Sequence, residues 1–102
     1  NKSSSIDMDV IKNIQDLTDI PLVLHGSSGI DYALRRKIAF NTNVCKFNIG
    51  TELRKTFGDT LRQEISNNPT MYDRIQLIKS TLPKLKESTK KVIENITLKT
   101  ND

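Results

Sequence analysis

A histidine followed by a loop of small residues is the first place in this 102-residue chain where chemistry could occur. His25 follows the apolar residues 20–24, and residues 26–29 read Gly-Ser-Ser-Gly. Imidazole binds metal ions and moves protons, and a loop of glycine and serine offers backbone N–H groups and hydroxyls to an anion. The pattern predicts an anion-binding loop, suited to a phosphate, directly after the histidine.

A second polar loop follows the next apolar run. Asn48, Gly50 and Thr51 lie at the end of residues 44–49, about one strand–helix repeat after His25. Consecutive strands joined by one crossover helix are usually neighbours, and their carboxyl ends line the ligand crevice of parallel α/β proteins. The two loops are therefore predicted to lie side by side and to hold one phosphate, helped by the positive ends of the following helices.

Simpler structural roles are open for the same residues. The loop of residues 26–29 could be a strand-to-helix turn with Ser28 as the N-cap, which is a common use of serine. Thr51 could equally cap the helix that follows it. His25 could be an ordinary loop residue, and Asn48 could be an asparagine that ends a strand.

The spacing of apolar residues predicts helices and strands in alternation. We expect a helix over residues 6–17, a strand over 20–24, a helix around 33–40, a strand over 44–49, a helix over 51–67, a short helix within 71–79, a terminal helix over 82–96 and a frayed end over 97–102. This order is typical of an α/β protein. The first run is continuous enough to predict a strand buried on both of its faces.

Individual side chains can also be assigned from the pattern. Arg35, Arg36 and Lys37 flank an apolar helical stripe and are predicted to face solvent. Cys45 lacks a basic neighbour and is predicted to be a small buried hydrophobe instead of a nucleophile.

Two parallel strands do not make a stable sheet when both faces must be buried, because each leaves an unpaired edge. The rest of the sheet is expected to lie elsewhere. In (β/α)8 barrels the phosphate site is frequently built by the loops after the last two strands. Residues 1–102 are therefore interpreted as the C-terminal segment of one TIM-barrel domain, with the last two strand–helix units and the terminal helices, and without the upstream strands.

Composition excludes several classes of protein. One cysteine and one histidine form neither an intrachain disulfide nor a self-contained zinc cluster, and no stretch approaches the ~20 apolar residues of a membrane span. The formal charge of +4 would suit an anion. A nucleic-acid module is a weaker hypothesis, for two reasons. The chain lacks aromatic residues interleaved with its basic ones, and its lysines at positions 84, 86, 90 and 91 are interrupted by acidic residues.

Two motifs carry a specific resemblance. Residues 21–30, Pro-Leu-Val-Leu-His-Gly-Ser-Ser-Gly-Ile, and residues 45–54, Cys-Lys-Phe-Asn-Ile-Gly-Thr-Glu-Leu-Arg, resemble the C-terminal portion of the class II, metal-dependent ketose-bisphosphate aldolases. This family includes fructose- and tagatose-bisphosphate aldolases. Both motifs match in order and spacing, and the similarity covers about residues 14–96.

The resemblance implies a cytoplasmic lyase of carbohydrate metabolism, with glycolysis among its settings. Family enzymes are (β/α)8 barrels, usually dimers or tetramers. In them Zn²⁺ or another divalent cation, held by three histidines, polarises the carbonyl of dihydroxyacetone phosphate. The expected reaction is the reversible cleavage of fructose 1,6- or tagatose 1,6-bisphosphate to dihydroxyacetone phosphate and glyceraldehyde 3-phosphate, without nucleic acid or membrane as a partner.

The resemblance also implies roles for single residues. His25 would be a metal ligand and Asn48 would bond the enediolate oxygens. The phosphate would be held by the two loops, namely by Gly26, Ser27 and Ser28 on one side and by Ile49, Gly50 and Thr51 on the other. The chain departs from the family pattern in having Ser27 where many members have glycine, and in lacking a proline soon after Ile30.

The family's other two histidine ligands and its acidic proton-transfer residue are absent from this chain. We therefore expect the 102 residues alone to be inactive. A second hypothesis follows from the same absence: a non-catalytic, aldolase-like subunit that keeps the sugar-phosphate pocket and assists the assembly of a partner.

Overall fold

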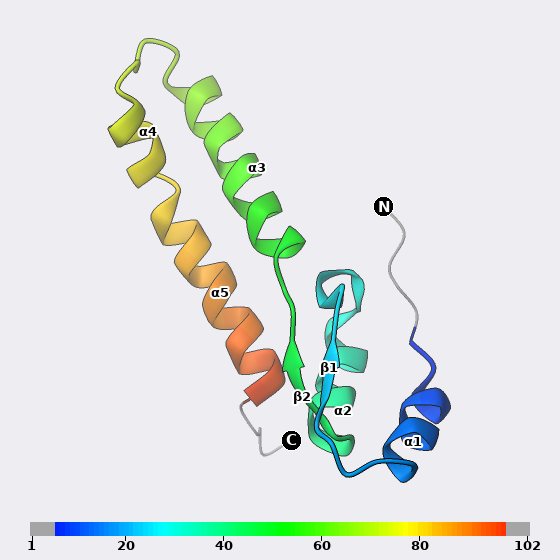
Figure 1. Ribbon diagram of the computed structural model, residues 1–102. Coiled ribbons are helices and arrows are strands. Elements are labelled where there is room, and N and C mark those ends of the chain that lie inside the picture. The colour runs from blue at the N-terminus through cyan, green and yellow to red at the C-terminus, as the bar shows by residue number, and fades with distance from the viewer. Residues whose placement is uncertain (1–5, 98–102) are drawn as a thin grey trace. The chain divides into compact units, whose positions relative to one another are not determined.

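In the computed structural model the described residues are 6–97, and they alternate helices and strands (Figure 1). The elements are α1 (Met8–Asp16), β1 (Leu22–Leu24), η1 (Ser27–Gly29), α2 (Tyr32–Asn41), β2 (Val44–Phe47), α3 (Thr51–Asn67), α4 (Arg74–Lys79) and α5 (Leu82–Thr97). The predicted α/β class and order of elements are confirmed. The frayed end predicted for residues 97–102 lies, apart from Thr97 in α5, outside the described residues.

The chain divides into two compact units. The first comprises Asn1–Gly50 and Ile93–Asp102, and the second comprises Thr51–Val92. Both strands, η1, α1, α2 and the last turn of α5 belong to the first unit. The second unit contains α3, α4 and the rest of α5.

The first unit is built on a parallel pair of strands. Leu22 pairs with Val44 and Leu24 with Phe47, with an irregularity between Leu22 and Val23. Asp31 caps α2 by accepting hydrogen bonds from the N–H groups of the second and third residues that follow it. The buried residues Ile11, Ile38 and Val44 form the core, and Ile6, Met8, Leu22, Leu24, Leu34 and Phe47 pack against it. One face of the strand pair is thereby covered.

The strands are shorter and less buried than predicted. Leu22 and Leu24 are half-buried, whereas Val23 between them is 46% exposed and Ile20 is 69% exposed. The prediction of a first strand buried on both faces is wrong for this chain, because only the core side of β1 is packed. Cys45 is likewise exposed, since its neighbour Val44 takes the inward position on β2.

Arg35 is fully buried, so its predicted exposure is wrong. Its Nη1 donates to the carbonyl oxygen of Ser27 at 3.1 Å and its Nε donates to Oδ1 of Asn95 at 2.8 Å. The guanidinium also lies over the Tyr32 ring, 4.6 Å from its centroid. These partners compensate the cost of removing a charge from water. Lys37, as predicted, is exposed.

Arg36 stabilises the end of the last helix. Its Nη1 donates to the carbonyl oxygens of Glu94 and Asn95, at 3.2 and 3.1 Å. Both carbonyls belong to the final turn of α5, where a helix has no backbone donors left for its own acceptors. A cation at that position also interacts favourably with the helix dipole.

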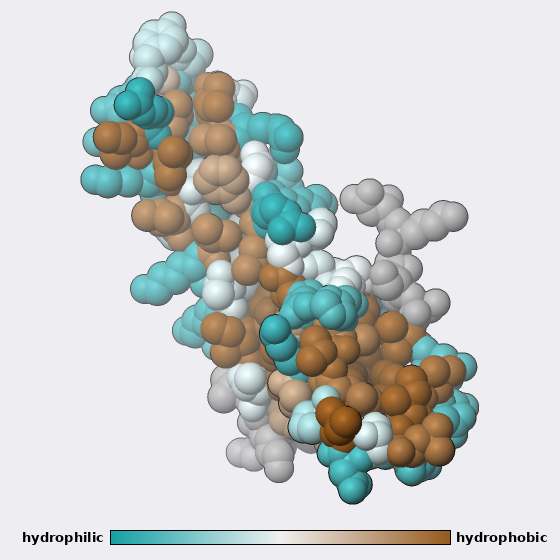
Figure 2. All heavy atoms as spheres, in the orientation of Figure 1, coloured by the Kyte–Doolittle hydropathy of each residue, from teal (hydrophilic) through white to brown (hydrophobic). Residues whose placement is uncertain are grey.

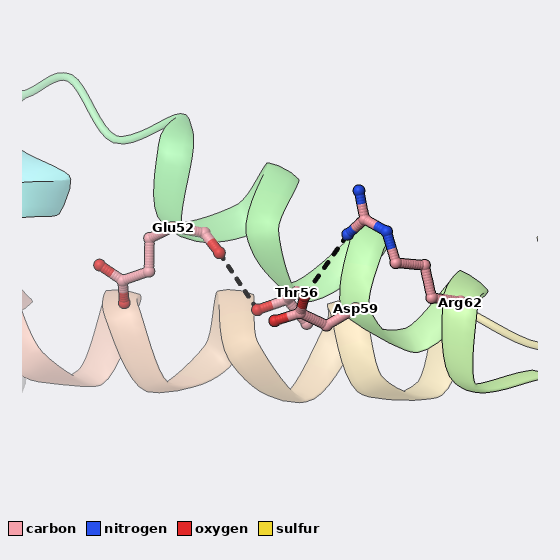
Figure 3. Close-up of polar contacts among 4 residues, drawn as sticks. All are labelled: Glu52, Thr56, Asp59 and Arg62. Carbon is pink, nitrogen blue, oxygen red and sulfur yellow. Dashed lines mark hydrogen bonds and ion pairs between the residues drawn. The ribbon is translucent and has the colours of Figure 1, made fainter. Parts of the chain in front are cut away.

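The second unit consists of α3, α4 and most of α5, and Figure 3 shows polar contacts along α3. Thr56 Oγ1 on α3 hydrogen bonds to the carbonyl oxygen of Glu52 and to Ser88 Oγ on α5, each at 3.1 Å. Asp59 and Arg62 form an exposed ion pair of 3.6 Å within α3. Lysines 84, 86, 90 and 91 on α5 are exposed, which confirms the prediction of a solvated helix face. No helix within residues 6–97 is long and apolar enough to cross a membrane.

Substitution of Ile38 tests where the core lies. Ile38 is completely buried, so Ile38→Ala is expected to lower the free energy of unfolding by about 2 to 5 kcal/mol, through lost burial and the cavity that remains. Lys37→Ala on the exposed side of the same helix is the matched control and is expected to change it by less than about 0.5 kcal/mol. Urea titration of the full-length protein that contains this chain measures both, and equal effects of the two variants would contradict the assigned core.

Candidate functional site

The two polar loops lie against each other at the carboxyl ends of the strands. Past the end of β1, the Asn48 N–H donates to the carbonyl oxygen of Leu24 at 2.9 Å, and the Ser27 N–H donates to that of Asn48 at 3.2 Å. The Gly50 N–H donates to Ser28 Oγ at 3.2 Å. These bonds confirm the prediction that the loop after His25 and the loop at residues 48–50 are neighbours.

Gly26 turns the chain out of β1 into the first loop. Its φ of 67° lies in the left-handed region, which glycine adopts without the penalty that a Cβ atom would bring. A short 3₁₀ turn follows, in which the N–H groups of Gly29 and Ile30 donate to the carbonyl oxygens of Gly26 and Ser27. The glycine therefore sets the direction in which the loop's backbone leaves the strand.

Ser27 is the internal support of the first loop. It is completely buried, its hydroxyl donates to the Leu24 carbonyl oxygen at 2.9 Å, and its N–H is bonded to Asn48. Both of its donors are thus used within the chain. Ser28 is half-buried and accepts the Gly50 N–H, while Asp31 is the N-cap of α2, so the alternative of Ser28 as N-cap is wrong.

His25 is exposed and is oriented by Asn48 from the neighbouring strand end. Nδ2 of Asn48 lies 2.9 Å from Nδ1 of His25. The direction of this bond depends on the imidazole tautomer and on which way the amide is turned. As the amide stands, its N–H donates to Nδ1, and the ring proton is on Nε2. Turned over, its oxygen would accept from an Nδ1–H group and leave the Nε2 lone pair open, the arrangement typical of a metal-ligating histidine.

The described residues can supply one metal ligand, but not the set of ligands that a metal site needs. Among residues 6–97, no group of at least three His, Cys, Asp or Glu side chains could hold a metal ion. A catalytic zinc ion typically takes about three protein ligands. His25 is exposed and has Asn48 beside its Nδ1, and a full site requires donors beyond those described.

Two of the residues predicted to bind phosphate lie in the second loop, after β2. Ile49 and Gly50 are both half-buried after β2. Thr51 is the first residue of α3 and belongs to the second unit, where its Oγ1 accepts a hydrogen bond from Arg54 Nη2 at 3.0 Å.

Arg35 and Asn95 are parts of this region that sequence reasoning missed. Asn95 is 8% exposed, and its Nδ2 donates to the Tyr32 carbonyl oxygen at 2.9 Å. A signal existed for both: Arg35 is three residues before the buried Ile38, and Asn95 is three residues after the buried Val92. At that spacing two residues share one face of a helix.

Two adjacent parallel strands, each followed by a polar loop that contains glycine, define an α/β protein. The sequence profile of the class II fructose-bisphosphate aldolase family matches residues 1–101. The chain belongs to this family, which confirms the resemblance carried by its two motifs. Aldolases of this family are carbon–carbon lyases of carbohydrate metabolism that generally depend on a divalent metal ion, typically Zn²⁺, and fold as TIM barrels.

A particular relative is similar over most of the chain. A protein of Klebsiella oxytoca described as D-tagatose-1,6-bisphosphate aldolase subunit GatY is 37% identical over 81 residues. The match covers 78% of this chain and 28% of that protein. The chain thus spans less than a third of the length of this relative.

Gly26→Ala tests the turn that starts the first loop. The substitution is expected to lower the free energy of unfolding by about 1 kcal/mol, because an alanine is strained at positive φ. A Cβ atom there would meet nothing within 4 Å, so the loss is conformational and not steric.

Gly58→Ala is the control with the opposite sign. Gly58 lies inside α3, where a Cβ atom would come within 3.3 Å only of the flexible end of Arg62. Helix propensity is expected to raise the free energy of unfolding by roughly 0.5 to 1 kcal/mol. Thermal unfolding of the full-length protein that contains this chain compares both variants, and a Gly26→Ala variant as stable as the wild type would contradict the left-handed turn.

Proposed function

We propose that residues 1–102 are the C-terminal segment of a (β/α)8 barrel, comprising its last two strand–helix units and the terminal helices. The intact protein would be a soluble, cytoplasmic aldolase that works as a dimer or tetramer. It would reversibly cleave a ketose bisphosphate, fructose 1,6- or tagatose 1,6-bisphosphate, to dihydroxyacetone phosphate and glyceraldehyde 3-phosphate. The observation that carries the proposal is the hydrogen-bonded pair of loops at the carboxyl ends of β1 and β2.

The uncovered apolar surface of the first unit supports the barrel. Val23 on β1 and Ile20 before it are exposed, and Figure 2 shows apolar atoms gathered over the region of α1 and β1. In a parallel sheet both faces are normally covered, and edges are paired with further strands. Additional strands beside β1 and β2 would bury this surface.

In this proposal the two loops hold the phosphate of the substrate. The backbone of Gly26 and Ser28, the Ser28 hydroxyl and the Gly50 loop provide the donors. Such donors bind a phosphate without a lysine, because several N–H dipoles converge on it. Ser27 acts from behind, since its own donors hold Leu24 and Asn48 in place.

His25 and Asn48 would act at the reacting end of the substrate. His25 contributes one ligand to a divalent cation that it shares with donors from other strands. When bound, such a cation acts as a Lewis acid on the ketone and stabilises negative charge on its oxygen. Asn48 holds the imidazole and donates its amide N–H to the enediolate oxygens as they gain charge.

A non-catalytic role is the second candidate. The relative from Klebsiella oxytoca is described as a subunit, and the described residues contain one suitable metal ligand in place of a set. In this alternative the chain keeps a sugar-phosphate pocket and assists the assembly of a partner protein.

Kinetics of the full-length protein that contains this chain separate the two functions. An aldolase is expected to hold about one divalent ion per subunit, to lose cleavage on chelation, and to lose at least about a hundredfold in kcat with His25→Ala. Ser28→Ala is expected to raise KM about tenfold, because a phosphate contact made equally in the ground and transition states lowers KM alone. Lys86→Ala, on the exposed face of α5, is the control for both variants.

A helper subunit gives the opposite result. It would show neither stoichiometric metal nor cleavage of any ketose bisphosphate, and it would increase the activity or stability of a partner protein. That outcome would replace the catalytic proposal with the second one.

Expression of residues 1–102 alone tests the segment proposal. The chain is expected to be poorly folded or self-associating and to have no aldolase activity, because its strand edges and metal ligands cannot be supplied locally. Circular dichroism, sedimentation and an aldol-cleavage assay measure this. A monomer with a cooperative melt and metal-dependent turnover would contradict it.

A further inference from the structure

A buried arginine connects the first loop to the end of the last helix. Arg35 and Ser27 are completely buried, and the Arg35 guanidinium donates both to the Ser27 carbonyl oxygen and to Oδ1 of Asn95. The Asn95 amide is fixed in turn, because its Nδ2 donates to the carbonyl oxygen of Tyr32, on the helix that carries Arg35. The guanidinium is therefore held at two points behind the loop, entirely within the first unit.

The contact with Ser27 acts on a single peptide group. The Ser27 carbonyl and the Ser28 N–H belong to the same peptide unit, and no peptide bond among the described residues is cis. In a trans peptide the N–H points opposite to the carbonyl. Because the carbonyl points toward Arg35, the Ser28 N–H faces away from the buried guanidinium.

The positive charge of Arg35 also makes the Ser28 N–H a stronger hydrogen-bond donor. The Ser27 carbonyl oxygen accepts from Arg35 at 3.1 Å and from the Ile30 N–H at 3.2 Å. Hydrogen bonds onto a carbonyl polarise its peptide group, and charge-assisted bonds in a buried environment do so most. The Ser28 N–H thus becomes a better donor to an anion, and a positive charge poorly screened by solvent lies behind it.

We propose that Arg35 is a positioning residue for the phosphate of the substrate. It fixes and polarises the Ser27–Ser28 peptide so that the loop binds the phosphate tightly, and Asn95 holds the guanidinium in place. This inference rests on the proposed function and adds to it a role for α2 and the last turn of α5. Arg35 itself touches neither the substrate nor the metal ion.

The neighbouring arginine provides a matched control. Arg36 ties α2 to the same end of α5 through the carbonyl oxygens of Glu94 and Asn95. A purely structural link between the two helices would be weakened by substitution of either arginine. A link to phosphate binding is expected only for Arg35, which bonds the Ser27 carbonyl.

Steady-state kinetics of the full-length enzyme, with inhibition by inorganic phosphate, tests the proposal. Arg35→Met is expected to raise both KM for the ketose bisphosphate and Ki for phosphate by roughly tenfold or more, with kcat within about threefold of wild type. Arg35→Lys keeps the charge but not the two-point geometry, so its KM should be intermediate. Arg36→Met is expected to lower the melting temperature and to leave KM within about twofold.

Unchanged KM and Ki in Arg35→Met, or equal increases in Arg36→Met, would overturn the inference and leave Arg35 a structural residue. Should Arg35→Met fail to fold, Arg35→Lys and Asn95→Ala decide by the same two constants, with rises of roughly threefold or more expected.

Phosphate binding also separates this inference from the proposed function. If the wild-type protein cleaves no ketose bisphosphate, its thermal stabilisation by inorganic phosphate is compared with that of Arg35→Lys. Weaker stabilisation of the variant would support the role of Arg35 in anion binding while the aldolase proposal fails. Equal stabilisation, or none in the wild type, would overturn the role of Arg35.

Discussion

The site depends on parallel pairing that continues beyond the two strands. The carbonyl oxygen of Leu24, the last residue of β1, accepts from the Asn48 backbone and from the Ser27 hydroxyl. The Asn48 carbonyl oxygen then accepts the Ser27 N–H. Without these bonds two loops about one strand–helix repeat apart would diverge as soon as the strands end. With them, His25 and the small-residue loop stay beside Asn48 and Gly50.

Buried polar groups support the first loop from behind. Ser27, Arg35 and Asn95 are buried, and no buried side-chain nitrogen or oxygen within residues 6–97 lacks a hydrogen-bond partner. A satisfied polar network is directional, because each bond fixes an orientation as well as a distance. An apolar core tolerates small shifts that such a network does not. A loop that must present N–H groups at one point therefore gains accuracy from the polar support.

Local features of the sequence predicted the order of elements and the adjacent loops, whereas burial depended on partners distant in the chain. The spacing of apolar residues, the glycine at position 26 and the proline at position 21 each affect the backbone within a few residues. Their structural effect could therefore be predicted from the sequence. The three-residue spacing of Arg35 and Ile38 places both on one helix face, but burial of the Arg35 charge also requires an acceptor from Asn95, 60 residues away. Cys45 and Val23 were assigned to a core that lies on one side of the strand pair only. Exposure of a strand residue depends on which further elements cover the sheet, and that information is not local.

The uncovered strand surface and the incomplete metal site have a single explanation in the proposed barrel. An apolar residue such as Val23, exposed on a parallel strand, is unfavourable unless another layer or strand covers it. A lone His25 at the end of the same strand is insufficient for a zinc ion. Further parallel strands would remove both deficiencies together, because each would bury apolar surface along its length and bring its carboxyl end to the edge where His25 lies. The exposed strand therefore favours a barrel segment, whether the whole protein is a catalyst or a helper subunit.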